Sequence, residues 1–277
     1  MKKQISILLL LFSATILFAQ NKEKIKGSKT VTTEQKEVGQ FTSIEVEDNI
    51  EIYLELGEKQ ELKIEADDNL HDIIKMDLKD KALRLYTSKE AIRYTKLMVK
   101  ITYTKDMNLV TSKNNAVINA IQEVQIDSIA FKSFDYSQLF LNVNSKKFIL
   151  QSNDKSKVEL NLKSEKSKIV LSQNASLKSL VVTQDFICDL YQKATAKIEG
   201  SSTNAIIRLD NNSNLTANKL TIKNIDLTAE AYSIGSINAE TSIILSASDK
   251  SETQLFGEPK IEIKKFTNEA KLLKKVK

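Results

Sequence analysis

The second half of this chain repeats a short apolar segment and a polar turn at intervals of roughly 20 residues, a period typical of repeat architectures. Turns rich in Asn, Ser, Asp and Lys begin at Phe134, Ser152 and Ser172, and again at Ala229 and Ala247. The interval between Ser172 and Ala229 would hold about three more units of the same period. A unit of this size cannot bury a core alone, so the repeat indicates stacked units that share one continuous core.

The units have the pattern of β-strands. Residues 50–56 (IEIYLEL), 61–66 (ELKIEA) and 97–103 (LMVKITY) alternate between apolar and mainly polar residues, as expected for strands with one buried face. The chain has six glycines and one proline, and Asn and Ser fill the places where Gly would usually turn a strand. In the second half we expect strands of three to five residues, each followed by a polar turn.

These observations predict an all-β fold: a single-stranded parallel β-helix, or β-solenoid, with the right-handed winding that parallel crossovers generally prefer. Seven coils at about 4.8 Å would form a rod of roughly 35 Å. A β-sandwich is the main alternative, and a left-handed hexapeptide helix lacks its six-residue period here. One short helix is expected near residues 68–76, where Asp67 or Asp68 could cap it.

The N-terminus has the features of an export signal. The first three residues are MKK, residues 5–18 are almost entirely apolar, and the chain becomes polar at residues 19–21. The apolar run is short for a membrane span and typical of a secretory signal peptide, which we expect to be cleaved after Ala19 or Gln20. An uncleaved membrane anchor is the alternative, and no later segment is expected to cross a membrane as a helix.

Four regions are therefore predicted. They are a signal peptide (1–20), a polar lead-in with a possible first strand (21–40), the β-solenoid domain (41–259), and a last strand with a basic tail (260–277).

The net charge of +5 arises in the tail, because residues 260–277 contain seven lysines and two glutamates. Nucleic-acid recognition favours arginine, of which the chain has three, so we do not expect a nucleic-acid partner. The tail lysines have two interpretations. They could protect the open edge of the last strand from aggregation, or they could make a peripheral contact with anionic lipid or acidic glycan.

Cysteine and histidine are almost absent. Cys188 is the only cysteine, and alternation places it with Phe186 and Leu190 on a buried face, so we expect an inert thiol. His71 is the only histidine, which leaves little material for a Ser-His-Asp set or a histidine zinc site. It lies in the short helix beside Asp72 and is expected at the surface.

No catalytic, metal or cofactor-binding residues are predicted, and the chain is expected not to be an enzyme. The alternative is a carbohydrate-active β-helix, in which two carboxyl groups about 5–10 Å apart would flank a glycosidic bond. Six aspartates on or near the turns are the candidates for that chemistry: Asp135, Asp154, Asp185, Asp189, Asp210 and Asp249.

Several segments resemble one bacterial family. Residues 41–46 (FTSIEV) and 50–57 (IEIYLELG) are similar to the opening of the "putative auto-transporter adhesin, head GIN domain" family. The Asp-Asn-Leu segment at residues 68–70 and the closing segments 247–250 (ASDK) and 256–259 (FGEP) match its later parts. Unlike that family, this chain has Asn, Asp and Lys in place of most turn glycines.

The resemblance spans roughly residues 30–263 and implies an exported β-solenoid in the periplasm or at the outer surface of a diderm bacterium. It offers no catalytic residues to carry over. We expect a non-enzymatic adhesion or structural binding module with an unknown protein or glycan partner, and a periplasmic ligand-binding module is a further alternative.

Overall fold

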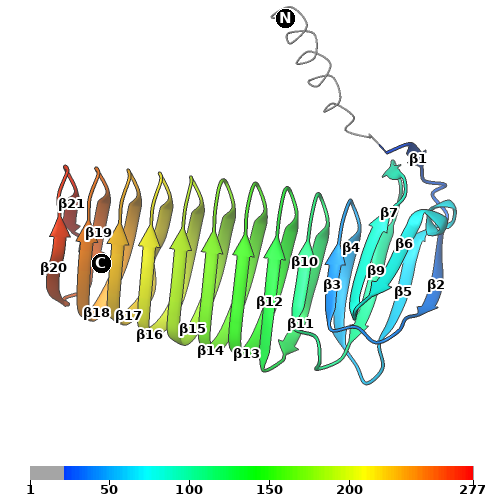
Figure 1. Cartoon of the computed structure of the whole chain (residues 1–277), viewed down its shortest axis with the longest axis horizontal. Helices are drawn as coiled ribbons and strands as arrows, with labels where there is room; N and C mark the ends of the chain where they lie inside the picture. The colour runs from blue at the N-terminus through cyan, green and yellow to red at the C-terminus, as the bar shows by residue number, and fades with distance from the viewer. Residues whose placement is uncertain (1–21, 277) are drawn as a thin grey trace, which may run out of the picture.

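The computed structural model describes residues 22–276, which form an elongated stack of β-strands (Figure 1). The predicted signal peptide lies outside the described residues. The N-terminal part contains β1 (Lys24–Lys26), β2 (Val31–Glu37), β3 (Ser43–Val46), β4 (Glu51–Leu56), β5 (Glu61–Asp67), the 3-10 helix η1 (Asp68–Ile73), β6 (Ile74–Lys79), β7 (Ala82–Thr87), β8 (Glu90–Ile92) and β9 (Leu97–Tyr103). The remaining strands are β10 (Leu109–Ser112), β11 (Val117–Gln125), β12 (Ser128–Ser133), β13 (Gln138–Ser152), β14 (Lys157–Leu171), β15 (Ser176–Leu190), β16 (Thr195–Leu209), β17 (Asn214–Ala229), β18 (Ile234–Ala247), β19 (Glu252–Phe256), β20 (Lys260–Phe266) and β21 (Lys271–Lys274).

Each long strand from β13 to β18 forms most of one coil. β13 pairs in parallel with β11 through its first half and with β12 through its second half, so one strand replaces two strands of the preceding coil. Residues 146, 165 and 184 drop out of the pairing, and there the strand bends from one sheet to the other. The first halves form a back sheet with β4, β9, β11, β19 and β21. The second halves form a front sheet, facing the viewer in Figure 1, with β3, β7, β10, β12 and β20.

The predicted parallel β-solenoid is therefore confirmed, with about nine turns where seven coils were expected. The expected strand length of three to five residues was wrong, because β13–β17 each run for 15 or 16 residues. The bend between the sheets keeps almost every residue hydrogen-bonded to the neighbouring coil, so no polar turn is needed at that corner.

The polar turns close each coil at the other corner. Asp135, Asp154 and Gln173 occupy the same position in three successive turns and have φ values of 60°, 61° and 59°. Asn and Asp tolerate this left-handed region better than other non-glycine residues, which explains their abundance in the turns. Further turns at residues 191–194 and 210–213 supply the units in the interval where the sequence repeat was blurred.

Inward side chains from both sheets fill one core. In β14, Val158, Leu160 and Leu162 on the back half are buried, as are Ile169 and Leu171 on the front half. The residues between them point outward, so the alternation of the sequence continues through the bend. Parallel register places each inward residue on the matching residue of the next coil, which makes the core continuous along the rod.

The predicted burial of Cys188 in β15 is confirmed. Phe186, Cys188 and Leu190 lie together in the core, and burial, with a smaller contribution from the nearby Asp189 carboxylate, raises the pKa of the Cys188 thiol. A thiol that does not ionise at neutral pH is a poor nucleophile, so Cys188 acts as an apolar packing residue.

The N-terminal end of the rod is closed by antiparallel strands. β5 pairs with β9 of the back sheet, β2 pairs with β5, and β6 pairs with β7 of the front sheet. The helix η1 connects β5 and β6 where a short helix was expected. It ends at Ile73, before the expected end at residue 76, and Ile74 is the first residue of β6. Neither predicted capping residue makes a side-chain cap.

Asp67 has a different role at this end. Its buried carboxylate accepts hydrogen bonds from the backbone N–H groups of Lys29, Thr95 and Lys96 at 2.8, 3.0 and 3.0 Å. Burial acts to raise the pKa of Asp67, but these backbone hydrogen bonds outweigh it and hold the pKa below its usual value. Asp67 thereby joins the lead-in to the loop before β9.

The expected surface position of His71 was wrong. Its side chain is buried, and a hydrogen bond of 2.9 Å connects Nε2 to Thr32 Oγ1 on β2. The polar lead-in packs β2 across η1, a long-range contact that the local sequence does not reveal.

Candidate functional site

The six aspartates proposed for carbohydrate chemistry divide between the turns and the front sheet. In the turns, the Asp135 carboxylate accepts a hydrogen bond from the backbone N–H of Asn114 at 2.9 Å, and Asp154 accepts one from Asp135 at 3.2 Å. Asp249 accepts from Asn268 Nδ2 at 2.7 Å. These three carboxylates therefore hold neighbouring turns together.

On the front sheet, Asp185 begins a hydrogen-bonded ladder, because Asn204 Nδ2 donates to it at 3.1 Å. Asp189 and Asp210 lie around Arg208, whose guanidinium is 3.6 Å from Asp210. Burial raises the pKa of Asp189, although Lys168 and Arg208 oppose the shift.

Arg208 also lies over the ring of Tyr191, with Cζ 5.6 Å from the ring centroid. The structure therefore brings Asp189 and Asp210 near one aromatic ring. Asp189 lies on the outer side of the front sheet and Asp210 at the start of the turn that follows β16, and Arg208 beside them neutralises part of their charge.

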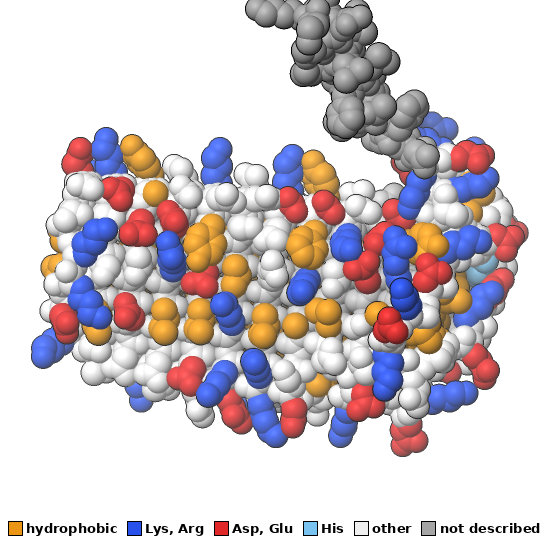
Figure 2. All heavy atoms as spheres, in the orientation of Figure 1, with side chains coloured by type: hydrophobic (Ala, Val, Ile, Leu, Met, Phe, Trp, Pro, Cys, Tyr) orange, Lys and Arg blue, Asp and Glu red, His pale blue; other side chains and the backbone are white. Residues whose placement is uncertain are grey.

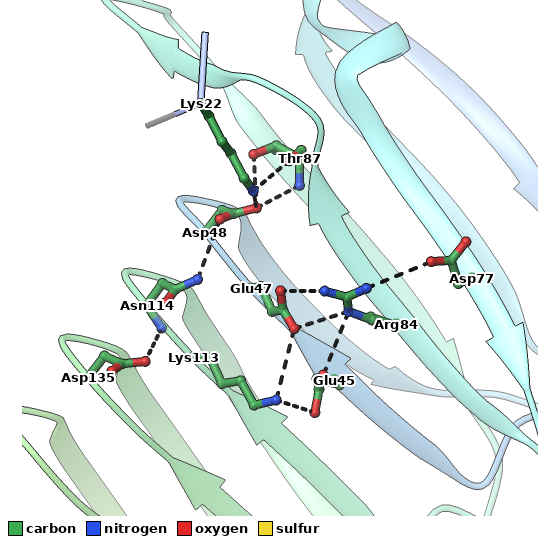
Figure 3. A network of polar contacts seen from close by, with 10 residues as sticks. All are labelled: Lys22, Glu45, Glu47, Asp48, Asp77, Arg84, Thr87, Lys113, Asn114 and Asp135. Atoms are coloured by element: carbon green, nitrogen blue, oxygen red, sulfur yellow. Dashed lines mark hydrogen bonds and ion pairs between the residues drawn. The ribbon is translucent and has the colours of Figure 1, made fainter. Parts of the chain in front are cut away.

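A polar network connects the lead-in to the first coils (Figure 3). Lys22 Nζ pairs with Asp48 and also donates to the backbone oxygen of Thr87 at 2.6 Å. Burial tends to raise the pKa of Asp48, but hydrogen bonds from Lys22 and Thr87 prevail and lower it. The backbone N–H of Thr87 donates to the same carboxylate at 2.8 Å. The contacts fix residue 22 against the turn before β4.

The second part of Figure 3 centres on Arg84 of β7, which binds Glu47 through Nε at 3.1 Å and Nη2 at 2.8 Å. This hydrogen-bonded pair lowers the pKa of Glu47 and raises the pKa of Arg84. Lys113, after β10, lies 2.8 Å from Glu45 of β3. Each of the three cations in this network, Lys22, Arg84 and Lys113, contacts a carboxylate of another segment, so the network stabilises the first coils and leaves none of its cations unpaired.

The front sheet carries a row of hydrophobic side chains along the rod (Figure 2). Parallel register aligns them from β10 to β16, with Lys168 as the one interruption: Leu109, Ala130, Ile149, Ile187 and Ile206. Ile206 is 57% exposed, and the other four are half-buried by their neighbours in the row. Most of this row therefore packs one coil on the next.

More apolar surface is open on the back sheet. Ile121 of β11 is 67% exposed, and Leu180 and Val182 of β15 are 49% and 45% exposed. Ile121 and Leu180 lie with Phe140 of β13 around a hollow of about 570 Å³, which we call the back-face hollow. It spans five coils, those of β11, β13, β14, β15 and β16.

Two irregularities of the back sheet frame this hollow. The register between β11 and β13 shifts between Ala120 and Val124, and the register between β16 and β17 shifts between Lys197 and Glu199. Bulges of this kind redirect side chains and increase local twist. The first one begins at Ile121, which points outward beside the hollow.

Polar side chains line the hollow beside the apolar ones and include both charges. Asn161 Nδ2 donates to Asn142 Oδ1 at 3.1 Å, forming an amide ladder. Glu199 is within 3.3 Å of Lys197 and within 3.8 Å of Lys219. Apolar side chains interspersed with amide and charged groups, among them Glu159 and Lys178 in the same outward column as Phe140, are suited to binding a partner surface by contact rather than to transferring protons.

Two structural findings bear on other kinds of site. Within residues 22–276, no group of three or more His, Cys, Asp or Glu side chains is placed to hold a metal ion. None of the helical segments in the same part of the chain is long and apolar enough to cross a membrane.

The sequence model of the "putative auto-transporter adhesin, head GIN domain" family matches residues 40–259, most of the coils described above. The chain belongs to this family. Its resemblance to the GIN-domain family, predicted from the opening and closing segments, is confirmed. No protein among those with curated descriptions is significantly similar in sequence.

Solved structures share the fold at low sequence identity. A "putative adhesin" from Parabacteroides distasonis is 15% identical, with a TM-score of 0.67 over 90% of this chain and 99% of that one. A "putative adhesin" from Parabacteroides merdae is 18% identical, with a TM-score of 0.64 over 91% and 99%. A "putative lipid binding protein" from P. distasonis is 11% identical, with a TM-score of 0.59 over 92% and 98%. At these identities the likeness shows the fold alone.

Sequence reasoning missed the back-face hollow of this GIN-domain protein. The available signal was the run Leu180-Val181-Val182, which contains three consecutive apolar residues. In a strand with one buried face, such a run must place at least one apolar side chain outside.

Proposed function

We propose that this protein is an exported, non-enzymatic binding module of the bacterial cell envelope or surface, and that it holds a protein partner against the back-face hollow. Three supports are independent of one another: the signal-peptide pattern at the N-terminus, membership of an adhesin-named family, and the exposed apolar floor of the hollow. The hollow carries the proposal, because it is the feature that gives the rod a specific place to bind.

The exposed side chains give the hollow its binding energy. Burying a large aliphatic side chain contributes about 1.5–3 kcal/mol when it is fully transferred from water. Ile121, Leu180 and Phe140 together therefore offer several kcal/mol to a partner that covers them. The polar side chains of the hollow would set orientation and exclude mismatched partners.

The chemistry of the floor favours a protein over a glycan. Sugars are usually held by flat, exposed aromatic rings, whereas this floor contains one phenylalanine among aliphatic side chains, and the chain has no tryptophan. Aliphatic anchors surrounded by polar groups are typical of protein contacts.

The test uses Leu180→Glu, which places a charge on the floor of the hollow. The matched control is Ile206→Glu, an equally large change at a 57% exposed position on the front sheet. Purified wild-type protein should bind intact bacterial or host cells, or isolated envelope proteins. Leu180→Glu should reduce that binding at least tenfold, while Ile206→Glu leaves it within about twofold.

Several outcomes would overturn the proposal. They are an absence of binding to any cell surface or envelope protein, an equal effect of both substitutions, and binding to glycans that Leu180→Glu leaves unchanged. Turnover on a glycan panel, lost in Asp189→Asn, would instead make the protein a carbohydrate-active enzyme.

A second candidate function is the binding of a small apolar ligand in the same hollow. Its volume of about 570 Å³ falls within the roughly 300–1,000 Å³ of ligand pockets, and one structural neighbour is named a "putative lipid binding protein". Thermal-shift screening against fatty acids and metabolites would favour this function if a ligand raised the Tm of the wild type but not of Leu180→Glu.

A further inference from the structure

The two ends of the rod differ in how the core is finished. At the N-terminal end, antiparallel strands cover the first coil. At the C-terminal end, β20 and β21 lie on β18 and β19, and no described strand pairs with their other side (Figure 1). All seven residues of β20 are exposed.

The exposed residues of β20 include core positions. Ile261 and Ile263 pair in register with Ile243 and Leu245, which are buried in the coil below. They therefore point into the space between the two sheets, but they are 43% and 51% exposed because no residue from 22 to 276 covers them. Phe266 continues the same row, and Leu272 faces it from β21. We call this apolar surface the terminal face.

Lysines surround the terminal face. The segment from 258 to 275 contains six lysines and three glutamates. Lys264 and Lys265 lie near Asp226 and Glu230 of the coil two before their own, at 3.9 and 3.7 Å. These half-exposed pairs are weak, so most of the positive charge remains available to a partner.

The charge argues against a second copy of this chain as the partner. Two terminal faces brought together would oppose lysines to lysines, which is unfavourable. The opposite end of the rod offers no match either, because β2 covers it with the polar sequence VTTEQKE. The partner should carry negative charge and accept exposed aliphatic and aromatic side chains.

We propose that the terminal face docks on the surface of an anionic lipid bilayer, so that the rod stands on the membrane by its C-terminal end. The negative surface potential attracts the lysines, and Ile261, Ile263 and Phe266 enter the boundary between headgroups and acyl chains. This docking site is at the end of the rod and does not depend on the back-face hollow.

The open strand edge fits a shallow contact. Unpaired backbone N–H and C=O groups cannot enter the hydrocarbon without a large cost. At headgroup depth they remain in contact with water and with phosphate oxygens, which accept hydrogen bonds from N–H groups. The lysine stems are long enough to keep their ammonium groups at the same level while the apolar side chains go deeper.

The experiment uses the full chain without its signal peptide and vesicles of phosphatidylcholine with or without phosphatidylglycerol. Because the chain lacks tryptophan, Ile263→Trp introduces a single fluorescent reporter on the terminal face. Its emission should shift to the blue with phosphatidylglycerol vesicles and not with pure phosphatidylcholine. The matched control, Ile206→Trp on the front sheet, should not shift.

Charge is tested with a second pair of variants. Lys271→Gln with Lys275→Gln should weaken co-sedimentation with anionic vesicles about 25-fold, at roughly fivefold per lysine near an anionic surface. The matched control is Lys163→Gln with Lys166→Gln, which removes two positive charges at the bend of β14, in the middle of the rod. This control should leave binding within about twofold. Raising the salt from about 0.1 M to about 1 M should weaken wild-type binding strongly.

Three outcomes would overturn the proposal. One is an absence of binding to anionic vesicles at low salt, and another is an equal loss of binding in both lysine pairs. The third is a dimer in analytical ultracentrifugation that dissociates in Ile263→Ser, which would make the terminal face a contact between copies. Leu180→Glu should bind vesicles normally, so failure of membrane docking and failure of the hollow are distinguishable.

Discussion

Replacing Phe148 with alanine tests whether the interior of the rod is one close-packed core. Phe148 is fully buried in β13, and its ring centroid is 6.1 Å from that of Phe131 in the coil before. Truncating a buried phenylalanine costs about 3–5 kcal/mol, which includes the cavity left behind. Losing the tilted ring pair accounts for about 0.5–1.5 kcal/mol of packing between the two coils. We expect a total of about 4 kcal/mol.

The adjacent residue provides the control. Ile149 points outward from the front sheet and is half-buried in the apolar row, so Ile149→Ala should cost only about 1 kcal/mol. A stacked-coil protein need not unfold in two states, so a single global free energy is not the best observable. Hydrogen exchange of the backbone amides measures each coil separately.

In Phe148→Ala, protection should fall most in β12, β13 and β14, by about three powers of ten for a loss of about 4 kcal/mol. Coils near β18 should keep most of their protection, because each coil contacts only its neighbours. Equal effects of Phe148→Ala and Ile149→Ala would refute the reasoning, since the two side chains would then not lie on opposite sides of the sheet.

Three other predictions follow from single residues. Asp67→Ala leaves three backbone donors without their acceptor and should lower the free energy of unfolding by about 3 kcal/mol, measured by denaturant unfolding. Because the folded-state pKa of Asp67 is lowered, its contribution to stability is present above the unfolded-state pKa and is lost as the pH falls through the folded-state pKa. The stabilities of the wild type and the variant should therefore converge in acid. Gly200→Ala should cost at least about 2 kcal/mol and lower the Tm, because residue 200 has φ of 120° and a Cβ there would be 2.1 Å from the Val181 oxygen. Cys188 should react with a thiol reagent only after unfolding; rapid labelling of the native protein would contradict its burial.

The coil repeat was predictable because its turns are chemically distinct. Asp135, Asp154 and Asp249 are residue types that accept positive φ, and they mark the repeat in the sequence. The turn with Gln192 and Lys193 was not visible, although both have positive φ. There the conformation is imposed by the neighbouring coil, since the backbone N–H of Lys193 donates to the oxygen of residue 211 at 2.9 Å.

The features that the sequence did not reveal depend on contacts between distant segments. His71 appeared exposed because its local pattern says nothing about β2, which belongs to the distant lead-in and covers it. The apolar run at Leu180 showed that one side chain must face outward, but alternation alone could not show that Ile121 and Phe140, from earlier coils, lie beside it. The hollow becomes visible only once the register between coils is known.

That register is open to direct measurement by pulsed electron spin resonance. Parallel pairing places Tyr53, Glu159 and Gln254 in one outward column of the back sheet, with Glu159 five strand spacings from Gln254 and Tyr53 eight. Spin labels on cysteines at these positions, in a Cys188→Ser background, should be about 24 Å apart for residues 159 and 254 and about 38 Å apart for residues 53 and 254. The stacked coils require a difference of about 14 Å between the two pairs, which corresponds to the three additional strand spacings. Two distances that do not increase with the number of coils would contradict the solenoid and remove the back-face hollow with it.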